Sequence, residues 1–316
     1  MTKLHLLSID LGASNGRGVV ADFDGRTLSL QETGRFPNGP VRLLSGLYWD
    51  PIHLYKEVLQ CIGTSVQAVG TLASLAIDGW SQDFGILDKQ GNLLGLPRHY
   101  RDPRTADSLR LATEVYSHNE LFRLTGRVPT QISTLCQLLA MKKTDKTALN
   151  NGESLLFIPN LIGYFLTGGK NSDVTLAAAS MLYNPFERGW SRDILEAFDL
   201  PSILPEIRPP GYRIGMLLPD AAEQIGIAAS ERIPLVSTVQ HDSSSAFLAI
   251  DSLNRKPCVY ISCGTWSVIG TSIESPLVHD EARKLGYNND PAYYGEQYFL
   301  AKYMTGFWIV QECMRE

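Results

Sequence analysis

Two segments far apart in the sequence repeat one arrangement: a short apolar strand, a turn of small residues, and a second strand that returns. The first spans residues 4–23 with its turn at 12–16, and the second spans residues 258–273 with its turn at Gly264-Thr265. Glycine allows such tight turns and lets a ligand approach the backbone closely. Each turn alone is an ordinary hairpin, but the pair predicts a nucleotide held between two related α/β regions. A weak internal duplication would produce the same repetition.

The composition is that of a globular protein, with 44% hydrophobic and 19% charged residues over 316 positions. At roughly 150 residues per domain this length predicts two domains, which we place at residues 1–232 and 233–316. The net charge of −5 argues against a dedicated nucleic-acid-binding protein. No run of about 18 apolar residues is present, so no membrane span is expected. The five scattered cysteines, without a Cys-x-x-Cys pair, favour a cytoplasmic protein with reduced thiols.

Local patterns predict the elements of this α/β fold. Apolar residues at helical spacing after a proline predict a helix over Pro51–Val69, and residues 105–165 are expected to be mainly helical. The proline-rich stretch 200–211 predicts a surface connection near a domain boundary. Short apolar runs bounded by turn residues predict strands at residues 4–10, 17–23, 28–35, 72–77, 84–87, 234–239, 258–262 and 266–273.

The first strand ends in an acid that leads into the small-residue turn. Backbone N–H groups of such a turn suit phosphate oxygens, Asp10 suits Mg²⁺ or its water shell, and Arg17 adds a cation. The candidate nucleotide-binding residues here are Asp10, Ala13, Ser14, Asn15, Gly16 and Arg17. The alternative is a tight hairpin in which Asp10 only stabilises the turn. The pattern is neither a P-loop nor a dinucleotide-binding fingerprint, because the turn enters a strand and not a helix.

A second acid follows the strand expected at 234–239, in the sequence His241-Asp242-Ser243. Small residues after Asp242 predict the start of a helix, where backbone N–H groups stabilise negative charge. An ionised carboxylate in that position suits a general base that accepts a hydroxyl proton. The alternative is an ordinary helix cap, a place that Asp and Ser favour. His241 and Ser243 are candidates for orienting a substrate.

A third group of polar residues surrounds an aromatic ring just after the strand at 72–77. The loop contains Trp80, Ser81 and Gln82, and Tyr100 lies downstream. Rings that pack on C–H faces, beside polar groups that bind hydroxyls, are typical of sugar sites. The alternative is an ordinary loop anchored by its tryptophan.

Together these motifs resemble the FGGY-type carbohydrate kinases, which belong to the superfamily of actin, hexokinase and the Hsp70 ATPase domain. The matching stretches occur in the family order and span nearly the whole chain. They are Ile9-Asp10-Leu11-Gly12-Ala13-Ser14-Asn15-Gly16-Arg17, residues 87–91 with 95–97, Tyr100-Arg101-Asp102-Pro103-Arg104-Thr105, His241-Asp242-Ser243, residues 260–267 and residues 306–312.

The resemblance implies an actin-like, ribonuclease-H-like fold in each domain, with ATP and a sugar meeting in the cleft between them. It implies transfer of the γ-phosphoryl group of ATP, with Mg²⁺, to the 1-hydroxyl of L-rhamnulose or a similar ketose. By position in the motifs, Asp242 matches the catalytic base, and Asp10 matches the acid that faces Mg²⁺. Gly264, Thr265 and Gln311 match further nucleotide contacts. Ser81 and residues 241–243 match sugar contacts. The implied assembly is a monomer or homodimer, with no nucleic-acid or membrane partner.

Three positions depart from the pattern of the family's rhamnulose kinases. Ser81 stands where glycine is typical, Gln82 stands where an apolar residue is usual, and Tyr303 replaces an expected sugar-contacting asparagine. These departures leave L-fuculose, a xylulose-type ketose or an autoinducer-like substrate open as alternatives. A nucleotide-binding or regulatory module without sugar transfer is a further alternative, although a sugar-type loop beside Asp242 favours the kinase.

Compared with the family, the sequence stops inside the first long helix of the second domain. We therefore expect an incomplete second domain whose apolar surface is exposed or covered by a partner. Whether these 316 residues transfer phosphate by themselves is open at this point.

Overall fold

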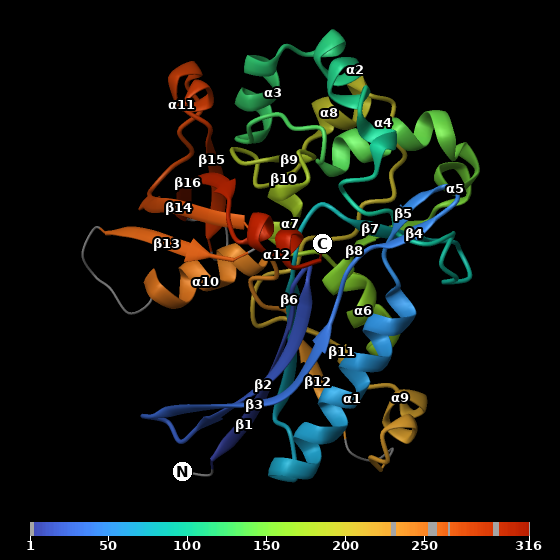
Figure 1. Ribbon diagram of the computed structural model, residues 1–316, viewed down its shortest axis with the longest axis vertical. Coiled ribbons are helices and arrows are strands. Elements are labelled where there is room, and N and C mark those ends of the chain that lie inside the picture. Colours follow the sequence, from blue (N-terminus) through green and yellow to red (C-terminus); the bar gives the residue numbers. More distant parts are fainter. Residues whose placement is uncertain (1–2, 229–231, 252–257, 265, 293–296, 316) are drawn as a thin grey trace.

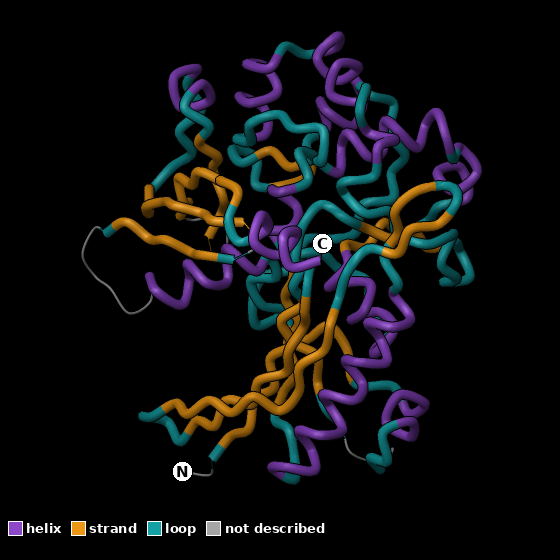
Figure 2. The backbone as a smooth tube through the Cα atoms, viewed as in Figure 1, coloured by secondary structure: helices purple, strands orange, loops and turns teal. Residues whose placement is uncertain are grey.

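The computed structural model describes residues 3–228, 232–251, 258–264, 266–292 and 297–315 (Figure 1). It is a mixed α/β structure in which a long curved sheet, a helical region and a second, smaller sheet meet near the middle of the molecule (Figure 2). Within the described residues, no helix is both long enough and apolar enough to cross a bilayer.

The first sheet has six strands in the order β11-β12-β6-β1-β2-β3. Strand β1 runs antiparallel to β2 and parallel to β6, as expected for a hairpin joined to a crossover. The expected strands in this part of the chain are confirmed, with slightly different ends. The bounds are β1 Leu4–Leu11, β2 Asn15–Phe23, β3 Leu28–Pro37, β6 Ser74–Gly79, β11 Arg213–Met216 and β12 Pro234–Val236.

Strand β12 belongs to this first sheet, since it pairs in parallel with β6 through Leu235 and Leu75. It is also shorter than the strand expected at 234–239. The segment that we assigned to a second domain, residues 233–316, therefore gives its first strand to the first sheet. A strand's own sequence shows that it is buried, but not which strand it will lie beside.

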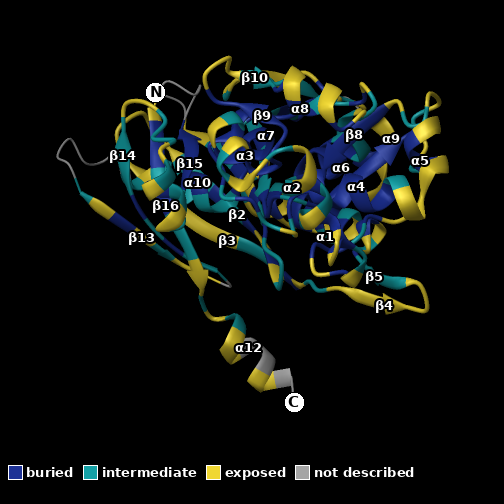
Figure 3. Ribbon diagram, turned by 90° about the horizontal axis from the view of Figure 1, so that it is seen from above, coloured by how far each residue is buried: buried dark blue, intermediate teal, exposed yellow. Residues whose placement is uncertain are grey.

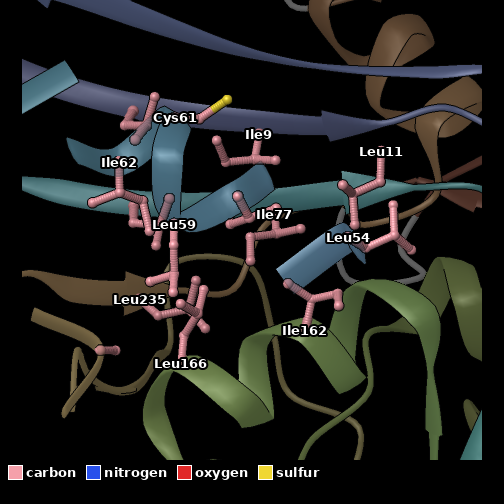
Figure 4. Packing of buried hydrophobic residues seen from close by; sticks show 14 of the residues in the cluster. Ile9, Leu11, Leu54, Leu59, Cys61, Ile62, Ile77, Ile162, Leu166 and Leu235 are labelled. Carbon is pink, nitrogen blue, oxygen red and sulfur yellow. The ribbon is translucent and has the colours of Figure 1, made fainter. Parts of the chain in front are cut away.

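Helices α1 (Pro51–Val69) and α6 (Ile158–Thr167) pack on the first sheet and cover its apolar side chains. Helix α1 has the bounds that its spacing predicts, and the carboxylate of Asp50 caps it by accepting from the N–H groups of Ile52 and His53. Figure 4 shows the resulting core, in which side chains from β1, β6, β12 and both helices interlock. This core fixes the strand ends that form the site.

The region after β6 is mainly helical, as expected, with one exception. Strand β8 (Ser154–Phe157), which pairs antiparallel with β7 (Phe84–Leu87), interrupts the segment 105–165 that was expected to be mainly helical. All four of its residues are buried, and a short apolar run alone does not distinguish a strand from a helix. The other elements after β6 are η1 Pro103–Thr105, α2 Ser108–Val115, α3 His118–Thr125, α4 Thr134–Thr144, α5 Lys146–Asn151, α7 Val174–Ala179, β9 Tyr183–Asn184, β10 Gly189–Trp190, α8 Arg192–Ala197 and α9 Pro219–Gln224. A short hairpin of β4 Val41–Leu43 and β5 Gly46–Tyr48 lies before α1 in the chain.

The proline-rich stretch 200–211 contains no helix or strand, as predicted. It is not wholly a surface connection, however. Ile203 is buried in the core of the helical region, and its backbone oxygen accepts from the N–H of Leu155 at 2.7 Å. The stretch therefore also supports β8.

The second sheet has four strands in the order β13-β14-β16-β15. The predicted hairpin is confirmed as β13 (Val259–Cys263) and β14 (Trp266–Ile273), and Thr265 in its turn lies outside the described residues. Phe247 of α10 packs on one face with Tyr260, while Val259 and Ile261, which alternate with Tyr260 along the strand, are exposed. Figure 3 shows exposed stretches along β13. The remaining bounds are α10 Asp242–Asp251, α11 Asp280–Lys284, β15 Tyr287–Ala292, β16 Gln297–Thr305 and α12 Trp308–Arg315.

Candidate functional site

The candidate site forms where parallel segments of the first sheet end. Asp10 and Asp78 are register partners at the ends of β1 and β6. Gly79 forms a parallel bridge with His241 and donates its N–H to the backbone oxygen of Gln240 at 2.9 Å. The carboxyl ends of parallel strands share one edge of a sheet. The turn after Asp10, the loop after Asp78 and the segment around His241 therefore lie side by side.

The turn between β1 and β2 is tightly held. The Gly12 N–H donates to the backbone oxygen of Asn15 at 3.0 Å, and Asn38 binds the backbone oxygens of Gly12 and Ser14 from the outside. A Cβ atom at Gly12 would lie 2.6 Å from the Asn15 oxygen, so the turn requires glycine there. Such a rigid small-residue turn suits the close approach of a phosphate group.

The other members of this predicted loop differ in exposure. Ala13 and Ser14 are partly buried in the turn, and Asn15 and Arg17 are exposed. Gly16 is buried against the ring of Phe36. Arg17 donates to one oxygen of Asp10 at 2.9 and 2.8 Å, so the predicted acid and cation form an ion pair.

Asp78 is a member of the site that sequence reasoning left out. Its pKa is raised well above the usual value, first by burial and then by repulsion from Asp10 and Asp242. One of its carboxyl oxygens is buried and has no hydrogen-bond partner among the described residues. The signal was present in the sequence, since Asp78, like Asp10, ends an apolar strand.

Asp242 begins helix α10 and lies beside His241. Its Oδ1 accepts from the N–H of Ser243 at 2.5 Å and lies 3.4 Å from His241 Nε2. Burial raises the pKa of Asp242, His241 opposes that shift, and Asp10 adds to it. The side chain nevertheless keeps 37% exposure, so a substrate can reach it. An acid that is both desolvated and accessible suits proton transfer.

His241 is held from several sides. Its two ring nitrogens lie 3.3 Å from the hydroxyls of Ser81 and Ser244, and its backbone N–H donates to Thr175 Oγ1 at 3.0 Å. The predicted sugar contacts Ser81 and His241 are therefore neighbours, although they come from different parts of the chain. Ser243 is the second residue of α10.

The rings predicted to face a sugar are largely buried. Trp80 is 5% exposed and Tyr100 is 6% exposed. The Trp80 indole N–H donates to Asp83 Oδ2 at 3.0 Å, and Trp49 donates to the same oxygen at 2.5 Å. Gln137 donates to Oδ1 at 2.8 Å. The Trp80 ring thus anchors the loop from within the core, which is the alternative that the sequence left open.

Gln82 links this loop to helix α4. Its φ of 80° lies in the left-handed region, and its backbone oxygen accepts from Thr134 Oγ1 at 2.8 Å. Its side-chain amide reaches Ser81 Oγ at 3.3 Å and accepts from the Thr134 N–H at 3.3 Å. The side chain therefore orients Ser81 beside His241.

The start of β14 lies beside the loop that follows Tyr100. Gly264 accepts from the N–H of Phe307 at 2.8 Å, which fixes the start of α12 beside the turn. The Arg101 guanidinium lies 5.5 Å from the ring centre of Trp266 and 4.5 Å from that of Trp308. Sequence reasoning did not single out Arg101 as a site residue. Gln311 lies in α12, but its side chain is outside the described part of the chain.

The described residues contain no group of three His, Cys, Asp or Glu side chains arranged to hold a metal ion directly. Asp10 and the unpartnered oxygen of Asp78 are nevertheless neighbours at the strand ends. Magnesium usually binds one or two carboxylates, substrate phosphates and several waters. The carboxylates of Asp10 and Asp78 fit that mode of binding.

Comparison with known proteins agrees with this geometry. Residues 5–249 match the N-terminal domain of the FGGY family of carbohydrate kinases, a range that extends past the domain boundary expected at 232. A rhamnulokinase of Bacteroides thetaiotaomicron is 30% identical over 312 residues, which cover 98% of this chain and 63% of that protein. A rhamnulokinase of Oceanobacillus iheyensis is 32% identical over 310 residues, with 98% and 64% covered. The chain thus spans less than two thirds of these relatives.

Solved structures share the fold. A ligand-bound xylulose kinase from Lactobacillus acidophilus superposes with a TM-score of 0.82 at 19% identity, covering 99% of this chain and 62% of that one. A glycerol kinase from Plasmodium falciparum with ADP gives 0.79 at 15% identity, covering 99% and 64%. The actin-like sugar-kinase fold expected from the motifs is confirmed. Since the family match extends over most of the chain, this protein belongs to the FGGY family of carbohydrate kinases.

Proposed function

We propose that this chain carries the sugar site and the catalytic base of an ATP-dependent ketose kinase, with L-rhamnulose as the first candidate substrate and its 1-hydroxyl as the acceptor. One observation carries the proposal. The desolvated, accessible carboxylate of Asp242 lies beside His241 and Ser81, at the same strand edge as Asp10 and the first turn. The rhamnulokinase relatives support the choice of sugar.

In the proposed reaction the sugar hydroxyl attacks the γ-phosphorus of ATP in line. The new bond joins the sugar oxygen to phosphorus, the bond from phosphorus to the β,γ-bridging oxygen breaks, and ADP leaves. Asp242 accepts the hydroxyl proton, and a raised pKa makes it a better base near neutral pH than an ordinary aspartate. Ser81 and His241 orient the sugar, and the turns around Gly12 and Gly264 position the phosphates.

Asp10 is the residue that would hold Mg²⁺, directly or through water, with the free oxygen of Asp78 as its neighbour. When bound, Mg²⁺ neutralises charge on the phosphate oxygens. Arg17 forms an ion pair with Asp10. This pairing keeps the carboxylate oriented toward the phosphate turn.

The proposal is tested by ADP release from wild type and Asp242→Asn with L-rhamnulose, L-fuculose and D-xylulose. We expect turnover with a 6-deoxyketose, and a loss of about 10²–10⁴-fold in kcat in the variant with unchanged thermal stability. Near-normal turnover in Asp242→Asn would reject the assignment of the base. Thermal stabilisation by a sugar without ADP release from wild type would point instead to a binding module.

A further inference from the structure

A buried polar cluster lies beside the site and takes no part in the chemistry described so far. It joins Arg127, in the loop after α3, to Asp290 of β15 through an ion pair, with side chains 9% and 2% exposed. Tyr303 of β16 donates its hydroxyl to the other Asp290 oxygen at 2.7 Å. The Arg127 guanidinium also lies 5.3 Å from the centre of the Tyr303 ring. We call these three residues the Arg127 brace.

Contacts other than the brace also dock the second sheet on the helical region. The Val128 N–H donates to the side-chain oxygen of Asn288 at 2.8 Å, and the Asn289 N–H donates to the Gly126 backbone oxygen at 2.9 Å. A buried ion pair generally adds little net stability over apolar residues of similar size. A positional role explains better why charges are buried here.

The Tyr303 ring connects the brace to the site. It faces the His241 ring with the two planes 12° apart and the ring centres separated by 6.5 Å. His241 in turn lies 3.3 Å from Ser81 Oγ and 3.4 Å from Asp242 Oδ1. Tyr303 therefore limits where the His241 ring can move, and Arg127 with Asp290 fixes Tyr303.

We propose that Arg127, Asp290 and Tyr303 are positioning residues that hold His241, and through it the sugar hydroxyl, in line with Asp242. None of the three is a catalytic residue, because the brace acts through His241. The inference rests on the proposed kinase function but makes a structural claim that can be measured without turnover. Loss of the brace lowers kcat and leaves the KM for ATP unchanged.

Two tyrosines on one strand provide a matched comparison. Tyr303→Phe removes the hydroxyl that binds Asp290, whereas Tyr298→Phe removes a hydroxyl that donates to the Pro185 backbone oxygen at 2.7 Å. Both variants keep the ring and lose one buried hydrogen bond. That of Tyr303 lies within the second sheet, and that of Tyr298 joins this sheet to the helical region. We expect kcat to fall about tenfold in Tyr303→Phe, with little change in Tyr298→Phe.

The turnover-independent measurement is the NMR spectrum of the six histidines, with the His241 ring signal assigned by His241→Gln. We expect that signal to shift in Tyr303→Phe and to stay in place in Tyr298→Phe. A His241 signal unchanged in Tyr303→Phe would overturn the proposal, whatever the kinetics. A second outcome separates the two proposals. If the His241 signal shifts in Tyr303→Phe but the wild-type protein phosphorylates no sugar, the brace is supported and the kinase assignment is not.

A double variant, Arg127→Met with Asp290→Leu, removes both charges together and so avoids leaving one buried and unpaired. It should fold, shift the His241 signal as Tyr303→Phe does, and keep its KM for ATP. A folded double variant with wild-type kcat and an unshifted His241 signal would contradict the positional role.

Discussion

The buried carboxyl group of Asp83 supports the loop that carries Ser81, although it has no part in the proposed phosphoryl transfer. Two indole N–H groups and one amide donate to its carboxylate, which favours the ionised form. Burial nevertheless dominates and raises the pKa of Asp83 to about 7. The loop that carries Ser81 is therefore held by a group that changes charge near neutral pH.

This shift predicts a pH dependence of stability. The folded-state pKa of Asp83 lies above the ordinary value of 3.8, so the folded protein binds this proton more tightly than the unfolded chain. Its contribution to the free energy of unfolding is complete below pH 3.8 and is lost as the pH rises through about 7. Urea unfolding of wild type and Asp83→Asn between pH 4 and 8 should show a shallower decline in the variant. Parallel pH profiles would contradict the assignment.

A second prediction at the residue scale concerns the first turn. Gly12→Ala places a Cβ atom within 2.6 Å of a backbone oxygen, so the turn must open. We expect weaker nucleotide binding, measured by calorimetry with ADP. As a control, Gly39→Ala adds a Cβ in open space beyond the turn and should leave that affinity unchanged. Equal affinities in the two variants would argue against phosphate binding by this turn.

Sequence patterns predicted some residues of the candidate site and missed others. Asp242, His241 and Ser81 were predicted from the motifs, and the structure brings them together. Asp78 and Arg127 were missed, because their significance depends on partners elsewhere in the chain: the neighbouring strand end for Asp78, and Asp290 for Arg127. Local spacing carries no information about such pairings.

At the scale of elements, helix α7 supports the segment that carries His241 and Asp242 through its first turn. Thr175 accepts the backbone N–H of His241 at 3.0 Å and donates its hydroxyl to Asp173, the capping residue of the helix, at 2.7 Å. These two buried hydrogen bonds fix the position of the His241 backbone beside β6. An element distant in sequence thus aligns the strand end with the loop that carries Ser81.

Thr175→Val tests that alignment. The change keeps the shape but leaves a buried N–H without its acceptor, at a cost of about 1–3 kcal/mol in the free energy of unfolding. We expect lower kcat as well as lower stability. Thr167→Val is the matched control, since Thr167 also accepts a backbone N–H, that of Gly169, but lies at the end of α6. A similar loss of kcat in both variants would show that stability alone is responsible.

Most elements could be predicted from the sequence because apolar runs, caps and turn residues act locally. Helix α1 and the strands of the two hairpins illustrate this. The partner of β12 and the strand β8 could not be predicted, since pairing is decided by tertiary contacts. We propose that the first domain extends beyond 232 to include β12, in agreement with its place in the first sheet.

At the scale of the whole molecule, the second sheet leaves an apolar face uncovered in the described structure. Val259 and Ile261 are 65% and 59% exposed on the side of β13 that faces away from α10. Surfaces of this kind favour association in water.

We expect this chain to self-associate through that face. The double variant Val259→Thr with Ile261→Thr keeps β-branched residues in the strand and removes much of the apolar surface. Sedimentation velocity should show a smaller share of associated species than in wild type. Leu28→Thr with Leu30→Thr, which alters exposed residues of β3, is the control. Equal association in all three proteins would place the contact elsewhere.

The candidate site and the Arg127 brace also join parts of the chain that are made at very different times. Ser81 and His241 are 160 positions apart, and Arg127 and Asp290 are 163 apart. Closing such long loops costs chain entropy that local contacts do not offset early in folding. On the ribosome, β1 and β6 therefore emerge long before the segment that carries Asp242. The candidate site is therefore assembled late in biosynthesis. Until then Asp10 and Asp78 lack Asp242 as a neighbour, and the loop that carries Ser81 lacks His241.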